Sequence, residues 1–220
     1  SAENRKIMKA EARFLRAFYY FLLFRQYGPV FIWGDNTPDL TIPNDEVDRH
    51  TVDECVKFIS DELSLAAADL PLKITDPSWY GRVTKGAALA AKSRLTLYAA
   101  RPLFNGASLY KGMKNHYGNF LFPQTADPSK WDLAAAAAKE VIDLGAYQLY
   151  KTTTGDTPFK QAINSYSGIF FELWNDELIF ARWDGDGYSW GVRAAPPMIL
   201  KEGYGGYAPS IKLVDTYPMG

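Results

Sequence analysis

The 220-residue sequence is poor in the side chains that build disulfides and metal centres, with one cysteine, Cys55, and two histidines, His50 and His116. A single cysteine excludes an internal disulfide framework and is compatible with either a reducing or an oxidising compartment. The three residues show no spacing typical of a zinc site or of a Cys-His nucleophile. We therefore expect no metal centre and no cofactor. The position of Cys55 on an apolar helix face predicts an inert, buried thiol.

The sequence also lacks an excess of charge and a long apolar run. Lysine and arginine number 24 against 25 aspartate and glutamate residues, without a basic cluster, which argues against nucleic acid or an anionic membrane surface as a partner. The eight apolar residues from Ala17 to Phe24 cover only ~12 Å as a helix, whereas a membrane span needs ~20 such residues. Neither end shows a targeting segment or an obvious stop, so we expect a piece of a longer protein, incomplete at both ends.

Motifs for catalysis are missing as well. The segment GRVTKGA lacks the Lys-Ser/Thr pair of a phosphate-binding loop, and no G-x-S-x-G sequence occurs. The sequence therefore predicts a protein that binds and does not catalyse.

Helical periodicity dominates the sequence up to Tyr150. Residues 11–28, EARFLRAFYYFLLFRQYG, place Phe14, Ala17, Phe18 and Phe21 on one stripe. The stripe widens toward Phe24, so we expect this helix to be buried all round at its end and to stop at the Gly-Pro pair that follows.

Three further helices are predicted at residues 51–70, 84–101 and 132–144. Thr51 and Glu54 form a capping box for the first of them, and Thr84 can cap the second. Alternating bulky and small faces favour stacked helical hairpins, although the helix starts are unequally spaced, unlike a regular tetratricopeptide array. We therefore expect a mainly α fold of degenerate tetratricopeptide-like hairpins over residues 1–150.

Residues 151–220 have a different character, with glycines, aromatic residues and short apolar runs in place of helical periodicity. Residues 177–183, ELIFARW, predict a strand, and residues 209–217 predict a last short helix. This loop-rich part, with minor β structure, is where we expect a binding surface within a single unit that spans residues 1–220.

Several segments together resemble the SusD/RagB family of glycan-binding outer-membrane lipoproteins. They occur in the family's order and are EARFLRAFYYFLLFRQYGPVFI, RHTVDECVKFISDELSLAAADLP, GRVTKGAALAAKSRLTLYAA, WDLAAAAAKEVIDLGAYQL, NDELIFARW and PSIKLVDTYPMG. The resemblance implies a cell-surface protein that holds oligosaccharides and passes them to a SusC-like TonB-dependent transporter in the outer membrane. It also implies that the only membrane attachment is a lipid on a missing N-terminal region. The family's ligand contacts vary, so the resemblance assigns no contact residue.

Candidate ligand contacts follow from sugar chemistry, because aromatic faces pack on sugar rings and polar side chains bond the hydroxyls. The segment ARWDGDGYSWGVR has both kinds of residue: an aromatic platform of Trp183, Tyr188 and Trp190, and polar partners Arg182, Asp184, Asp186 and Arg193. The competing interpretation is that Trp183 ends a buried strand and that the others pack beneath a loop.

Loop aromatic residues elsewhere are weaker candidates, namely Trp79 with Tyr80, and Trp33. Trp131 and Trp174 flank regular elements, so we predict that they pack.

The Asp184–Asp186 pair also begins like a calcium-binding loop. Tyr188 and Ala195 stand where the fifth and twelfth ligands belong, which excludes an EF-hand and leaves only an irregular cation site open. Nor do these neighbours suit a glycosidase, whose carboxyl groups lie ~5.5 or ~6.5–9.5 Å apart across the scissile bond.

The alternative function is a helical-repeat adaptor that binds a peptide or protein in a groove and no glycan. An adaptor would keep its aromatic residues within the helices, whereas this sequence also places them in predicted loops, at Trp79, Trp183, Tyr188, Trp190, Tyr204 and Tyr207. That distribution favours the ligand-binding interpretation.

Overall fold

The computed structural model describes residues 2–36, 41, 47–172, 174–181 and 210–216. The chain divides into two compact units, Ser1–Ala181 and Arg182–Gly220. In the second unit the described residues contain the short helix α7 (Ile211–Val214), which lies within the predicted last helix. The predicted contacts Arg182, Trp183, Asp184, Asp186, Tyr188, Trp190 and Arg193 lie outside the described residues.

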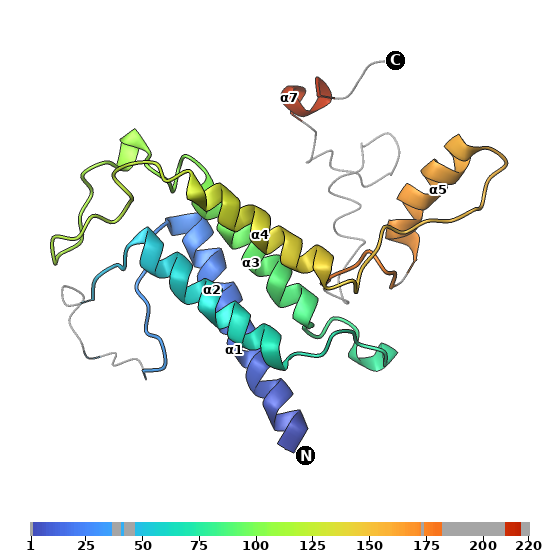
Figure 1. The fold of residues 1–220 in the computed structure, drawn as a ribbon, viewed down its shortest axis with the longest axis horizontal. Coiled ribbons are helices and arrows are strands. Elements are labelled where there is room, and N and C mark those ends of the chain that lie inside the picture. The colour runs from blue at the N-terminus through green and yellow to red at the C-terminus, as the bar shows by residue number, and fades with distance from the viewer. Residues whose placement is uncertain (1, 37–40, 42–46, 173, 182–209, 217–220) are drawn as a thin grey trace, which may run out of the picture. The chain divides into compact units, whose positions relative to one another are not determined.

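Four long helices form the scaffold of the first unit: α1 (Ala2–Tyr27), α2 (Val52–Asp69), α3 (Lys85–Ala100) and α4 (Ser129–Asp143). Each packs mainly on the next one along the chain, so that they lie side by side in the order α1, α2, α3, α4 (Figure 1). The mainly helical fold is confirmed. Among the described residues, no helix is both long and apolar enough to cross a lipid bilayer.

Helix α1 supplies the large side chains of the core. Phe14, Phe21 and Phe24 are almost completely buried, which confirms the predicted stripe, and the helix ends at Gly28, whose φ is +72°. The expectation that its last turns are buried all round is wrong, because Leu23 is 44% exposed and Tyr27 is 72% exposed. Helix α1 lies at the end of the stack, so α2 and α3 cover one side of it only.

Helix α2 begins as predicted with a capping box. The Thr51 hydroxyl accepts from the Glu54 amide, and the Glu54 carboxylate accepts from the Thr51 amide. One turn later Cys55 is completely buried, and its Sγ lies 3.4 Å from the carbonyl oxygen of Val30. Burial raises the pKa of this thiol to about 11.

A buried carboxylate joins α1 to α2. The Glu62 side chain is 9% exposed and lies 3.4 Å from Nε of Arg13. Arg16 donates from Nε to the same oxygen at 3.2 Å. Because both guanidinium groups converge on one carboxylate, the pairing aligns the polar edge of α1 with α2.

Small residues let α3 approach its neighbours closely. Buried positions on α3 include Gly86, Ala87, Ala88, Ala91 and Ala99, and Ala134 and Ala137 are the buried positions of α4. Their short side chains allow the helix axes to lie near one another.

The predicted helices at residues 84–101 and 132–144 are confirmed. The second begins three residues earlier than predicted, at Ser129.

Helix α5 (Pro158–Phe171) was not predicted from the sequence. The Thr157 hydroxyl accepts from the Lys160 amide and Pro158 occupies the first turn, a start signal that the surrounding aromatic residues obscured. It packs on the preceding segment, where the Thr152 amide donates to Ser165 Oγ. Its other side is an exposed apolar stripe of Phe159, Ile163, Tyr166 and Phe170.

The predicted strand at residues 177–183 is wrong over its described part. Residues 177–181 form turns and irregular structure, and the one β pairing among the described residues is an isolated bridge between Lys114 and Phe120. A strand needs a partner for its backbone groups. The apolar residues of this segment pack instead on α1, where the Phe180 ring lies 5.6 Å from that of Phe14.

We expect Glu62→Ala to lower the free energy of unfolding by about 2 kcal/mol, because it leaves two partly buried arginines without their shared acceptor. Chemical denaturation measures this change. Asp61→Ala is the matched control, since Asp61 pairs with Lys57 at the surface and its removal should cost less than about 0.5 kcal/mol. Equal effects of the two substitutions would contradict a structural role for the Glu62 cluster.

We expect the Cys55 thiol to react with Ellman's reagent at pH 8 at least ~100-fold more slowly in the native protein than in guanidinium chloride, because it is buried and protonated. Its pKa is raised by folding from 9.0 to about 11. Its contribution to stability is therefore complete below about pH 9 and is lost as the pH rises to about 11.

The Cys55→Ala variant, which has no thiol to ionise, is the control for this pH dependence. Across the same interval the unfolding free energy of the wild type should fall relative to that of the variant. Parallel curves, or equal labelling rates in the folded and unfolded protein, would refute the buried thiol.

Candidate functional site

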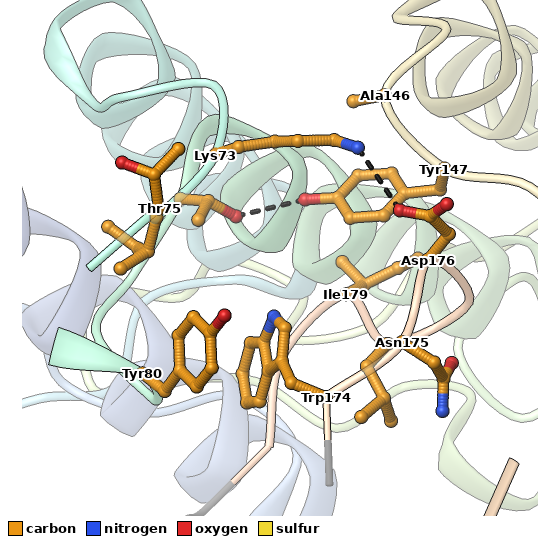
Figure 2. A pocket seen from close by; sticks show the side chains of 12 residues that line it. Lys73, Thr75, Tyr80, Ala146, Tyr147, Trp174, Asn175, Asp176 and Ile179 are labelled. Carbon is orange, nitrogen blue, oxygen red and sulfur yellow. Dashed lines mark hydrogen bonds and ion pairs between the residues drawn. The ribbon is translucent and has the colours of Figure 1, made fainter. Parts of the chain in front are cut away.

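A cavity of about 340 Å³ lies where three segments of the first unit meet near the start of α3. Its described lining comes from the chain before α3, from the residues after α4, and from the segment after α5 (Figure 2). The segments that meet there are residues 73–84, 146–147 and 174–179.

Two stacked aromatic rings form one wall of the cavity. The rings of Tyr80 and Trp174 are 4.8 Å apart between centroids, with an angle of 13° between their planes. The Tyr80 hydroxyl and the Trp174 indole nitrogen lie on the same edge of this stack, on the side where Tyr147 lies (Figure 2). Because the rings cover each other's inner faces, the wall combines this polar edge with the apolar surface of the outer ring faces.

A short turn positions Tyr80. Residues Pro77–Trp79 form the 3₁₀ helix η1. The Asp76 carboxylate accepts from the Ser78 amide at 2.9 Å and from the Ser78 hydroxyl at 2.7 Å. These bonds lower the pKa of Asp76, the hydroxyl bond having the larger effect, so the carboxylate stays ionised and continues to hold the turn.

The start of α3 positions Tyr147. The Tyr147 hydroxyl is 3.0 Å from the Thr84 hydroxyl, which also accepts from the Ala87 amide as the helix cap. The Tyr147 ring lies directly against Gly86, where a Cβ atom would come within 2.3 Å of it. Only glycine leaves room for this ring at the helix start.

An ion pair forms the opposite wall. Lys73 Nζ lies 3.3 Å from Asp176 Oδ1, and both side chains are about half exposed. The side-chain amide of Gln148 donates to the other carboxylate oxygen of Asp176 at 2.9 Å. Hydrogen bonds from Gln148 and then from Lys73 lower the pKa of Asp176.

The cavity contains one of the described sequence-predicted candidates, Tyr80. Its neighbour Trp79 is 47% exposed and does not line the cavity; its ring lies beneath the Arg82 guanidinium, 4.3 Å away. Trp33 packs edge-on against Phe31, with 4.7 Å between the ring centroids.

Of the two tryptophans predicted to pack, Trp174 does so and Trp131 does not. Trp131 is 49% exposed on α4, and Trp174 both packs on Tyr80 and lines the cavity. The sequence did carry a signal for Trp174, because it is followed directly by Asn175 and Asp176, the polar groups that bind hydroxyls.

A second cavity, of about 360 Å³, lies between α2, α3 and α4. None of its described lining residues is aromatic, and its rim carries the Lys92–Glu140 and Lys130–Asp53 ion pairs. It therefore lacks the ring surface that stacks on sugars. Among the residues that the structure describes, no group of three histidine, cysteine or carboxylate side chains is arranged to hold a metal ion.

Comparison with known proteins gives the family. Residues 1–97 match the SusD-like family, described as starch-binding and associating with the outer membrane. The solved structure of the protein BT4246 is 30% identical with a TM-score of 0.71, over 85% of this chain and 36% of that one. The chain belongs to the SusD-like family.

Two further structures agree. A SusD-like protein from Bacteroides fragilis NCTC 9343 is 26% identical with a TM-score of 0.71, over 100% of this chain and 36% of that one. A SusD-like carbohydrate-binding protein from the same organism shows the fold alone, at 24% identity and a TM-score of 0.50 over 68% of this chain and 23% of that one. The chain thus spans 36% of the length of the first two structures. A comparison with curated proteins gave no match.

We expect Gly86→Ala to destabilise the protein by about 1 kcal/mol or more, although alanine normally favours a helix by a similar amount. The added methyl group would collide with the Tyr147 ring. In a Tyr147→Ala background the same substitution should be neutral or stabilising, since the ring is gone. Denaturation of the two single variants and the double variant measures this coupling, and additive effects would refute the contact.

Proposed function

We propose that the chain binds an oligosaccharide at the cell surface and that the cavity at the start of α3 holds it. The observation that carries the proposal is the stacked Tyr80–Trp174 pair facing the Lys73–Asp176 pair across one cavity. Membership of a family described as starch-binding supports it.

The arrangement suits a sugar on chemical grounds. A pyranose ring presents C–H groups on its faces and hydroxyls around its edge, so it needs flat apolar surface beside hydrogen-bonding groups. The aromatic wall provides the first, and Asp176 and Lys73 provide the second. Half-exposed polar groups leave much of the ligand hydrated, so we expect modest affinity.

The protein's location and partner are also part of what we propose. We propose that it works without catalysis, is anchored to the outer membrane by a lipid, and delivers the bound glycan to a SusC-like TonB-dependent transporter. The family description supports an outer-membrane setting. The loop residues Trp183, Tyr188 and Trp190, with their polar neighbours, stay predicted contacts that would extend the binding face.

We expect Trp174→Ala to weaken binding of the protein's glycan by about tenfold or more, because it removes a stacking surface at the centre of the site. The ligand is found first, by titrating the wild type calorimetrically with neutral and acidic oligosaccharides from plant, host and microbial polysaccharides. The variant is then titrated with the glycan that binds.

Trp131→Ala is the matched control, since Trp131 is an exposed tryptophan on α4 that does not line the cavity. It should leave the affinity unchanged. Loss of binding in Trp190→Ala but not in Trp174→Ala would move the site to the loop. No binding of any oligosaccharide by the wild type would contradict the function itself and favour the adaptor alternative.

A further inference from the structure

The cavity is electrically balanced. Lys73 and Asp176 are the charged members of its described lining, one of each sign, and their side chains face each other at 3.3 Å. The remaining polar groups of this lining are uncharged hydroxyls and amides. From the described lining alone, a ligand in this cavity therefore meets a neutralised cation and no net charge.

Gln148 holds Asp176 at both its side chain and its backbone. The side-chain amide of Gln148 donates to Oδ2 of Asp176 at 2.9 Å. The backbone amide of Gln148 donates to the backbone carbonyl of Asp176 at 3.2 Å. The hydrogen bond from the Gln148 side chain, followed by the hydrogen bond and the charge of Lys73, lowers the pKa of Asp176 and keeps the carboxylate ionised at neutral pH. Asp176 thus stays beside Lys73 as a fixed counter-charge and not as a group that swings away.

We propose that Asp176 determines ligand specificity: by neutralising Lys73 it makes the cavity accept uncharged sugar rings and discriminate against uronic acids and sulfated sugars. This inference rests on the proposed function. A single carboxylate thereby selects between two chemical classes of glycan whose rings stack equally well on aromatic side chains.

Hydrogen-bond chemistry explains why a neutral sugar fits. A carboxylate only accepts and an ammonium only donates. Neighbouring hydroxyls on one ring satisfy both, since one donates to Asp176 while the next accepts from Lys73. The pair therefore matches a vicinal diol without either charge being left unpaired.

An acidic sugar meets the opposite situation. Its carboxylate or sulfate can bond Lys73 only while lying beside a second anion, Asp176, which the Gln148 side chain holds in place. Like charges at this separation repel. Because both side chains are about half exposed, solvent weakens the repulsion, so we expect discrimination of roughly tenfold and not complete exclusion.

The test compares matched probes. The neutral oligosaccharide that binds best in the titration is oxidised at C6, which converts primary hydroxyls to carboxylates and keeps the linkage. Calorimetry on the wild-type chain then gives the ratio of affinities for the neutral and the oxidised form. We expect a ratio of roughly ten in favour of the neutral form, and an equal or stronger affinity for the oxidised form would overturn the inference.

The Asp176→Asn variant identifies the responsible residue. Asparagine keeps the shape and an acceptor for Gln148 but leaves Lys73 without its counter-charge, so the preference for the neutral form should fall by about tenfold. A merely structural role would weaken both probes together and leave the ratio unchanged. Asp176→Glu keeps a counter-charge for Lys73 and should show the wild-type ratio. In Asp176→Asn, raising the salt concentration should reduce the gain in affinity for the oxidised probe.

Asp143→Asn is the matched control, because Asp143 forms an ion pair with Lys139 on α4, outside the cavity. It should leave the ratio at the wild-type value. If acidic oligosaccharides bind best in the initial titration, the proposed function stands and this inference fails. If no oligosaccharide binds, both fail.

Discussion

The structure depends on burying the apolar face of α1. Phe14, Phe21 and Phe24 are too large to be covered by one neighbour, and they contact a core to which α2 and α3 both contribute. Burying each of these rings contributes roughly 1.5–3 kcal/mol relative to exposure. Helix α2 covers α1 and packs in turn on α3, and the small residues of α3 let α4 pack on it closely.

The start of α3 positions part of the cavity. Thr84 serves two purposes, because its hydroxyl caps α3 and also contacts Tyr147. The next residue, Lys85, donates its amide to the Pro71 carbonyl at 2.8 Å, which ties the beginning of α3 to the end of α2. These contacts fix Tyr147 and the chain before α3 to the ends of two helices, and a binding site requires such rigid support.

Much of the scaffold was predictable because its signals are local. The capping box at Thr51 and the cap at Thr84 each lie within one turn of the helix that they delimit, so periodicity and capping chemistry suffice. The failures share the opposite property. ELIFARW has the composition of a strand, but no described segment offers it a partner, and tertiary packing on Phe14 decided its conformation.

The candidate site was predictable only in part for a related reason. Tyr80 was identified because a loop aromatic residue is conspicuous in the sequence. Trp174 was assigned to packing because its proximity to Tyr80 is a long-range fact, created by two segments that are 94 residues apart (174 − 80) in the numbering of the chain. Sequence patterns identify which chemistry is available, whereas the meeting of distant segments requires the fold.

A single segment, residues 174–179, contributes to both walls of the cavity, through Trp174 and Asp176. Residues 174–179 have no regular secondary structure and are attached through side-chain contacts, among them Asp176 to Lys73 and the Tyr150 amide to the Glu177 carboxylate. A ligand that contacts both walls binds only while this segment is docked, so its apparent dissociation constant is the intrinsic one divided by the docked fraction. The Tyr150–Glu177 contact, which never reaches the ligand, therefore helps to set the affinity for it.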